Sequence, residues 1–109
     1  MVHSEKLIFD VEAASESGAR NLHTPDCVTS QQTYNAALHA VGSVIEGAVE
    51  VAERRFDNAF CAVRPPGHHA ENDYAMGFCF FNNIALAAEF LCSEMGFKRV
   101  LIFDFDVHH

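Results

Sequence analysis

The strongest change from apolar to polar positions lies at residues 99–109. Residues 100–103 are apolar and mostly β-favouring, which is typical of a strand buried in a parallel sheet. Polar groups gather only at the C-terminal end of this run, where open α/β sheets place their functional sites. Because side chains alternate along an extended chain, Asp104, Asp106 and His108 are expected to project from the same face.

Residues 30–55 show apolar positions spaced alternately by four and three, which predicts an amphipathic helix that covers a sheet. The stripe consists of Tyr34, Leu38, Val41, Ile45, Ala48 and Ala52. Thr29 and Gln32 fit a capping box at the start of this helix. His39 lies beside the stripe, and we interpret it as a structural residue. Before this helix the pattern is weak, and residues 7–9 favour a short strand.

A second buried strand is predicted at residues 58–63, where a short apolar run leads into two prolines. Proline donates no ladder hydrogen bond, so the pair ends the strand and restricts the loop that follows. A further helix is predicted from Asn82 or Asn83 to a stop at Gly96. The strand, helix and strand over residues 58–107 form a right-handed crossover unit, which places both strand ends on one edge of a parallel sheet.

That shared edge would carry His68 and His69 from the first strand and three polar residues from the second. Asp106 and His108 offer one oxygen and one nitrogen ligand to a divalent ion, with Asp104 as a partner or second ligand. A lone aspartate at a strand end is more often a cap, and a surface histidine pair is usually only solvated. Two carboxylates beside an apolar strand, however, cost several kcal/mol unless a cation offsets them, which favours a metal.

The composition narrows the class of protein. The 109 residues suffice for one domain at most, and two ligands are fewer than the three usual in catalytic zinc sites, so we expect a fragment. A formal charge of −8 opposes direct binding to nucleic acid. The four cysteines lack disulfide or metal-binding spacing, and no segment resembles a signal peptide or a membrane span. We therefore expect a cytoplasmic protein with reduced, buried thiols and no membrane partner.

Three motifs in a fixed order resemble the histone deacetylase superfamily, most closely its class II-like branch, which includes bacterial acetylpolyamine amidohydrolases. They are Arg-Pro-Pro-Gly-His-His-Ala at 64–70, Gly-Phe-Cys-Phe-Phe-Asn-Asn at 77–83 and Asp-Phe-Asp-Val-His-His at 104–109. The resemblance is strong over residues 34–109. It implies an α/β protein with the three-layer arginase/deacetylase fold, in which a parallel sheet is flanked by helices. Residues 1–109 would then be a partial deacetylase-like domain that lacks both ends.

The resemblance also implies a zinc-dependent amidohydrolase that removes acetyl groups from acetylated lysine or polyamine-type amines. In that case Asp106 and His108 are zinc ligands and His68 and His69 are catalytic, with His69 as the general base. Asp104 is then the carboxylate partner of His68. Gly77 and Phe78 line the tunnel for the acyl-lysine chain. The family also has a structural potassium site, which would draw on residues 104–108.

Several family features are missing from this sequence. The third zinc ligand, an aspartate, and the tyrosine or histidine that polarises the carbonyl would both follow His109, so we expect the isolated 109 residues to be inactive. Phe105 stands where many class II members carry tryptophan. One alternative is a truncated, non-catalytic deacetylase-like module kept for binding or assembly. A binuclear manganese ureohydrolase is disfavoured, because a histidine pair after Pro-Pro-Gly fits a mononuclear amidohydrolase better.

Overall fold

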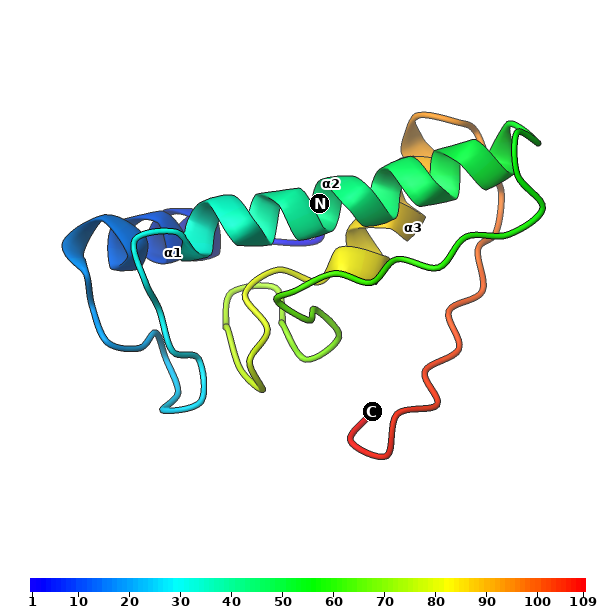
Figure 1. Cartoon of the computed structure of the whole chain (residues 1–109). Coiled ribbons are helices and arrows are strands. Elements are labelled where there is room, and N and C mark those ends of the chain that lie inside the picture. The colour runs from blue at the N-terminus through cyan, green and yellow to red at the C-terminus, as the bar shows by residue number, and fades with distance from the viewer.

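The computed structural model describes residues 1–109 as three helices joined by long loops (Figure 1). The helices are α1 (Glu5–Ser17), α2 (Thr33–Ala52) and α3 (Asn83–Ser93). The long helix α2 contacts both α1 and α3. The loop 64–82 and the C-terminal segment both lie on the same side of α2 (Figure 1).

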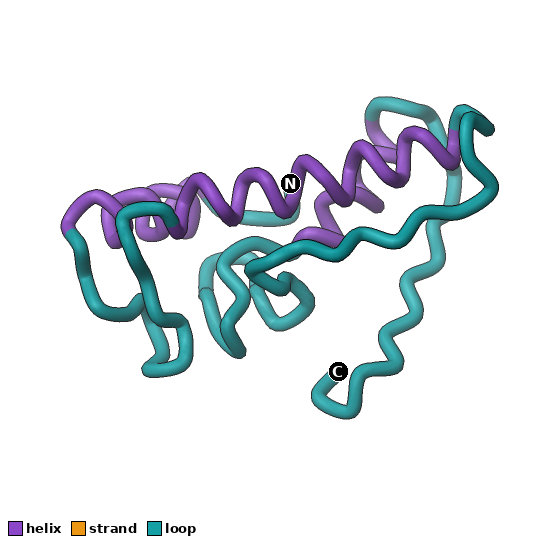
Figure 2. The backbone as a smooth tube through the Cα atoms, viewed as in Figure 1, coloured by secondary structure: helices purple, strands orange, loops and turns teal.

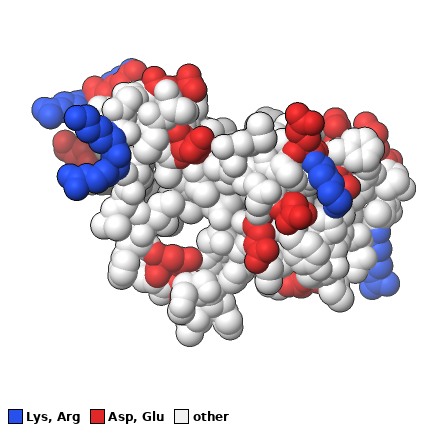
Figure 3. Space-filling view, turned by 180° about the vertical axis from the view of Figure 1, so that it is seen from behind, with Lys and Arg blue, Asp and Glu red and all other residues white.

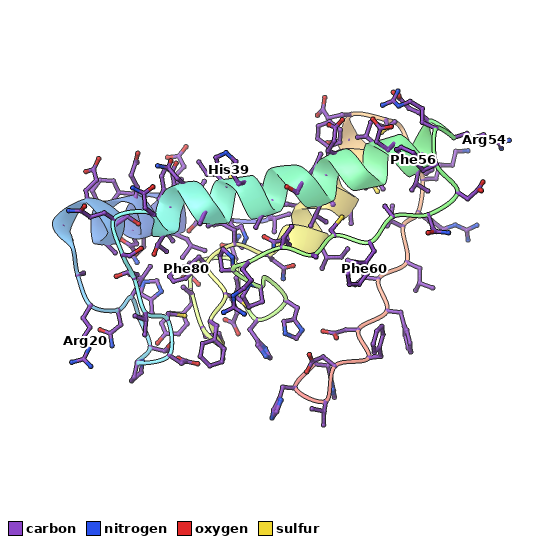
Figure 4. All side chains as sticks on the ribbon, viewed as in Figure 1. Arg20, His39, Arg54, Phe56, Phe60 and Phe80 are labelled. Atoms are coloured by element: carbon purple, nitrogen blue, oxygen red, sulfur yellow. The ribbon has the colours of Figure 1, made fainter.

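The helix predicted over residues 30–55 is confirmed as α2, but its predicted capping box is not formed. Gln32 occupies the N-cap position without a side-chain hydrogen bond. Instead, the hydroxyl of Thr33 accepts a hydrogen bond from the backbone N–H of Ser30 at 2.8 Å. His39 is exposed on α2 and points away from the loops (Figure 4).

The start predicted for the next helix is also confirmed. The side-chain oxygen of Asn82 accepts a hydrogen bond from the backbone N–H of Ala85 at 3.1 Å and so caps α3. The helix ends at Ser93, and Gly96 lies beyond it with a positive φ of 73°. Only glycine takes that backbone conformation without steric cost, which agrees with a chain reversal there.

Residues 7–9 are helical, so the predicted short strand is wrong. Ser4 caps α1 by accepting a hydrogen bond from the N–H of Leu7, and Gly18 ends the helix in the left-handed conformation. Leu7 and Val11 are completely buried one turn apart. The helical spacing of these two side chains, rather than the short apolar run, therefore determined the local structure.

The core lies where α1, the start of α2 and residues 75–81 meet. Its buried members come from α1, the loop after it, α2 and residues 75–81: Leu7, Val11, Cys27, Ala37, Ala75, Phe80 and Phe81. The two phenylalanines directly precede α3, and Phe80 is labelled in Figure 4. The core therefore joins the N-terminal helix to the loop that leads into α3.

The predicted parallel sheet is not formed by these residues. Residues 58–63 and 100–107 are mostly extended but make no ladder with each other or with other segments, and Figure 2 shows no strand. They are not buried either: Phe60 is 93% exposed and projects away from α2 in Figure 4, and Leu101 is 90% exposed. A strand is stabilised by hydrogen bonds to a neighbour, and neither segment has one here.

Charge is distributed unevenly over the surface. On the face seen in Figure 3, acidic groups are spread widely, whereas lysines and arginines gather toward the two ends. This agrees with the excess of fifteen acidic over seven basic side chains. None of the helices combines the length and the apolar character that crossing a membrane requires.

The packing of α1 gives a first prediction. Leu7→Ala should lower the free energy of unfolding by about 2–5 kcal/mol, because it removes a fully buried side chain and leaves a cavity. Phe9→Ala is the matched control on the same helix, where the side chain is 67% exposed, and it should change stability by about 0.5 kcal/mol or less. Urea denaturation measures both, and equal losses would contradict the assignment of the buried face.

Candidate catalytic site

A hydrogen bond of 2.7 Å joins Nδ1 of His68 to Oδ2 of Asp104, so the predicted contact between these residues is present. The other carboxylate oxygen of Asp104 accepts the backbone N–H of Asp106 at 3.0 Å. The hydrogen bond from His68, together with that N–H, lowers the pKa of the Asp104 carboxyl below its usual value. An ionised Asp104 only accepts, so Nδ1 of His68 carries the proton of this hydrogen bond.

A pocket of about 450 Å³ brings together most of the residues that the sequence singled out. Its lining consists of Asp26, His68, His69, Gly77, Phe78, Asp106 and His108. Asp104 does not line the pocket itself, but it is hydrogen-bonded to His68, which does. Asp26, from the loop between α1 and α2, also lines the pocket, although none of the sequence motifs contains it.

The second histidine lies against the first and against a glycine. The ring centroids of His68 and His69 are 4.2 Å apart, with the planes tilted by 38°. His69 packs so closely on Gly77 that a side chain there would overlap the imidazole. Gly77 and Phe78 both have positive φ values, of 56° and 65°. This conformation is costly for phenylalanine, and it leaves Phe78 59% exposed beside the pocket.

Asp106 and His108 also line the pocket and form a local turn. Oδ1 of Asp106 accepts the backbone N–H of His108 at 2.8 Å, and Nδ1 of His108 lies 4.0 Å from the same oxygen. No group of three His, Cys, Asp or Glu side chains in residues 1–109 is close enough together to hold a metal ion. These two side chains are an oxygen and a nitrogen donor of the types that zinc accepts, so the donor set fits zinc and supplies half of a four-coordinate site.

Two asparagines at the start of α3 hold residues 64–70, the histidine loop, by the backbone. The amide of Asn82 donates to the carbonyl oxygens of Ala70 at 3.2 Å and His68 at 3.5 Å. The amide of Asn83 donates to the carbonyl of Pro65 at 3.2 Å. In the sequence these asparagines mark a helix start and end one of the three family motifs, but nothing in their spacing points to the loop.

Gly67 makes the closest approach between this loop and α3, which gives a second prediction. A Cβ atom at Gly67 would lie 2.5 Å from the backbone nitrogen of Asn83 and 2.6 Å from the carbonyl oxygen of Phe81. Gly67→Ala should therefore destabilise the fold by about 1–3 kcal/mol in urea denaturation. Gly42→Ala is the control, because nothing lies within 4 Å of its Cβ position, and it should stabilise α2 by about 0.5–1 kcal/mol. A neutral Gly67→Ala would contradict this packing.

The cysteines are all unpaired, as expected for reduced thiols. Cys27 and Cys79 are fully buried, and burial raises the pKa of both thiols. Cys61 is half-buried and Cys92 is exposed, so the expectation of burial is correct for only two of the four.

Comparison with known proteins gives a consistent result. The histone deacetylase domain model matches residues 1–109. The chain is 56% identical over 118 aligned positions to histone deacetylase 18 of Arabidopsis thaliana, covering 100% of this chain and 17% of that protein. It is 54% identical over 74 positions to histone deacetylase 9 of Homo sapiens, covering 68% of this chain and 7% of that protein.

A solved structure is similar as well. The crystal structure of the HDA15 HD domain matches with a TM-score of 0.77 and 35% sequence identity, over 88% of this chain and 27% of that one. The fold thus corresponds to part of a deacetylase domain. The chain belongs to the histone deacetylase family, and it spans 7% to 17% of the length of the curated relatives it matches.

Proposed function

We propose that these residues form part of the catalytic site of a zinc-dependent amidohydrolase that removes acetyl groups from acetylated lysine or polyamine-type amines. The observation that carries the proposal is the hydrogen bond between His68 and Asp104, in a pocket that also contains His69, Asp106 and His108. Membership of the histone deacetylase family supports the deacetylase class. The free thiols suit a cytoplasmic location, which is part of the same proposal.

The two histidines would divide the proton transfers of amide hydrolysis. Hydrolysis requires a base for the attacking water and an acid for the departing amine. Asp104 fixes His68 with its proton on Nδ1, which orients the ring and stabilises it when charged. His69 has no carboxylate partner and lies against His68, so it would accept the proton of the attacking water and assist protonation of the amine.

Asp106 and His108 would hold zinc, with the remaining ligands from other parts of the domain. A bound zinc ion lowers the pKa of a coordinated water and polarises a carbonyl group. Oδ1 of Asp106 accepts the His108 N–H, and Oδ2, which makes no hydrogen bond, would be free to bind the metal. A structural potassium ion near residues 104–108 stays a prediction of the family resemblance.

Gly77 and Phe78 would form one wall of the substrate channel. The left-handed backbone at Phe78 costs about 1–2 kcal/mol, and such strain persists where the surrounding structure requires it. Here it directs an aromatic ring to the rim of the pocket, and Gly77 leaves room for His69. An apolar wall beside a histidine pair suits the aliphatic chain of acetyl-lysine or an acetylpolyamine.

The extended segments would become adjacent strands of the parallel sheet within a whole deacetylase domain. Residues 58–63 lead into the histidine loop, and residues 100–107 lead into Asp106 and His108. The exposed side chains of Phe60, Leu101 and Phe103 supply apolar surface for neighbouring strands and helices. Pairing of these segments would satisfy their backbone hydrogen bonds and bury that surface.

A hybrid enzyme tests the function directly. In it, residues 1–109 replace the matching segment of histone deacetylase 18 of Arabidopsis thaliana, and turnover of acetyl-lysine peptides and acetylpolyamines is measured with zinc content. The unaltered relative is the control. Hydrolysis by a zinc-loaded hybrid supports the proposal, whereas a folded hybrid that binds zinc without hydrolysing either substrate would contradict it.

The second candidate is a non-catalytic binding or assembly module. The observation that favours it is the large exposed apolar surface of residues 100–107, since such patches often mark contact surfaces. The same hybrid separates the two candidates, because a binding module should give neither bound zinc nor turnover.

A further inference from the structure

His3 is a buried histidine outside the pocket, with both ring nitrogens engaged. The residue is 4% exposed. Its Nδ1 lies 2.8 Å from the carbonyl oxygen of Glu71, and its Nε2 lies 2.8 Å from the backbone nitrogen of Asn82. A backbone N–H only donates, so Nε2 is the acceptor and Nδ1 carries the proton that is donated to Glu71. His3 is therefore a neutral imidazole in one defined tautomer.

Both partners of His3 control the loop of the histidine pair. Glu71 follows directly after the loop, so its carbonyl anchors the loop exit. Asn82 donates its side-chain amide to the carbonyls of His68 and Ala70, while its backbone N–H is held by His3. His3 thus bonds Glu71, the residue after the histidine loop, and also Asn82, whose side chain is hydrogen-bonded to the loop carbonyls.

Neighbouring contacts hold His3 in place. The N–H of Ser4 donates to the carbonyl of Asn72 at 2.8 Å, and the amide of Asn72 donates to the carbonyl of Val2 at 2.8 Å. The ring of His3 packs on Phe81, with centroids 5.7 Å apart. The N-terminal segment is therefore fastened to residues 71–72 on both sides of the imidazole.

We propose that His3 is a positioning residue for the histidine pair: its hydrogen bond to Asn82 keeps His68 aligned with Asp104, and its hydrogen bond to Glu71 fixes the imidazole that makes it. The catalytic consequence rests on the proposed function, whereas the geometric consequence does not. Loss of the Asn82 bond would release the Asn82 amide from the carbonyl of His68. The His68 ring would then no longer hold one tautomer.

The test uses the full chain with ¹⁵N-labelled histidine, and NMR reads the tautomer of His68 in three variants. His3→Phe keeps a ring on Phe81 but removes both hydrogen bonds. His3→Gln places an amide where Nε2 lies, and His3→Asn reaches the position of Nδ1 only. His39→Phe is the control, since His39 is exposed and its ring bonds only the carbonyl of Asn35.

We expect His68 to keep the Nδ1–H tautomer in the unaltered chain, in His3→Gln and in the control. His3→Phe and His3→Asn should shift it to a mixture of both tautomers while circular dichroism stays unchanged. If His3→Phe fails to fold, the comparison of His3→Gln with His3→Asn decides. An identical His68 tautomer in every folded variant would overturn the proposal. A variant that loses the Nδ1–H tautomer only when the whole chain unfolds would overturn it as well.

Activity separates this inference from the proposed function. In the hybrid enzyme, His3→Phe should lower kcat by about tenfold to a hundredfold with little change in KM, because misaligned catalytic groups slow the chemical step. His3→Gln should restore most of the rate. A folded, zinc-loaded hybrid that is inactive before any substitution defeats the proposed function, and the His68 spectrum of the full chain still decides the role of His3.

Discussion

Replacing His69 with alanine is expected to lower kcat for deacetylation in the hybrid enzyme by about 10²–10⁴-fold, the usual contribution of a positioned acid–base group. His69 lines the pocket beside His68 and makes no hydrogen bond to a carboxylate, so its removal takes away a proton carrier without disturbing Asp104. Zinc content should stay unchanged, because His69 is not one of the proposed ligands. Steady-state kinetics and elemental analysis of the same preparation measure both quantities.

The matched control for this result is His39→Ala on the exposed face of α2, which should leave both the rate and the metal content unchanged. A rate within threefold of the unaltered hybrid would contradict the role of His69 as the base. Loss of zinc together with the rate would instead assign His69 to the metal site.

Asp106→Ala is expected to weaken zinc binding by about tenfold or more. Loss of a group that only orients a ligand lowers metal affinity by about that much, and loss of the ligand itself should lower it at least as far. The carboxylate also accepts the N–H of His108, so part of any loss could come from the turn. Asp106→Asn retains an acceptor oxygen for that N–H but removes the charge, and it separates the two effects. Competition with a zinc chelator measures the affinity of each variant.

His108→Ala should weaken zinc binding to a similar extent, because it removes the nitrogen donor. Equal affinity for zinc in Asp106→Ala and in the unaltered hybrid would exclude Asp106 as a ligand. Equal losses in Asp106→Ala and His69→Ala would show that the proposed division between ligands and proton carriers is wrong.

The helical elements were predicted well where their periodicity was long. The stripe over residues 30–55 extends over several turns, and α2 lies within that range. In α1 the pattern was short. The three consecutive apolar residues 7–9 led to the prediction of a strand, although Leu7 and Val11 are spaced one helical turn apart. The capping box at Thr29 and Gln32 also failed, because the hydroxyl of Thr33 and the backbone of Ser30 satisfy each other instead.

Short motifs predicted the polar residues of the candidate site. They did not predict the residues that hold those polar groups in position. Pro-Pro-Gly-His-His and Asp-x-Asp-x-His each place their polar groups within a few residues, so their chemistry is visible locally. The residues that hold these groups in position come from distant parts of the chain. His3 is 68 residues from Glu71 and 79 from Asn82, and no local pattern connects positions so far apart.

By itself, the sequence determined the family, the long helix α2 and the identity of the polar groups at the candidate site, because each depends on residues close together along the chain. The contact of Asp104 with His68 was already implied by the family resemblance, and the structure shows it. Only the tertiary structure decided that Asp26 joins the pocket and that His3 and Asn82 hold the histidine loop. It also decided that residues 58–63 and 100–107 remain unpaired here. The physical reason is that strand pairing and loop anchoring require partners brought together by packing, which a local pattern does not specify.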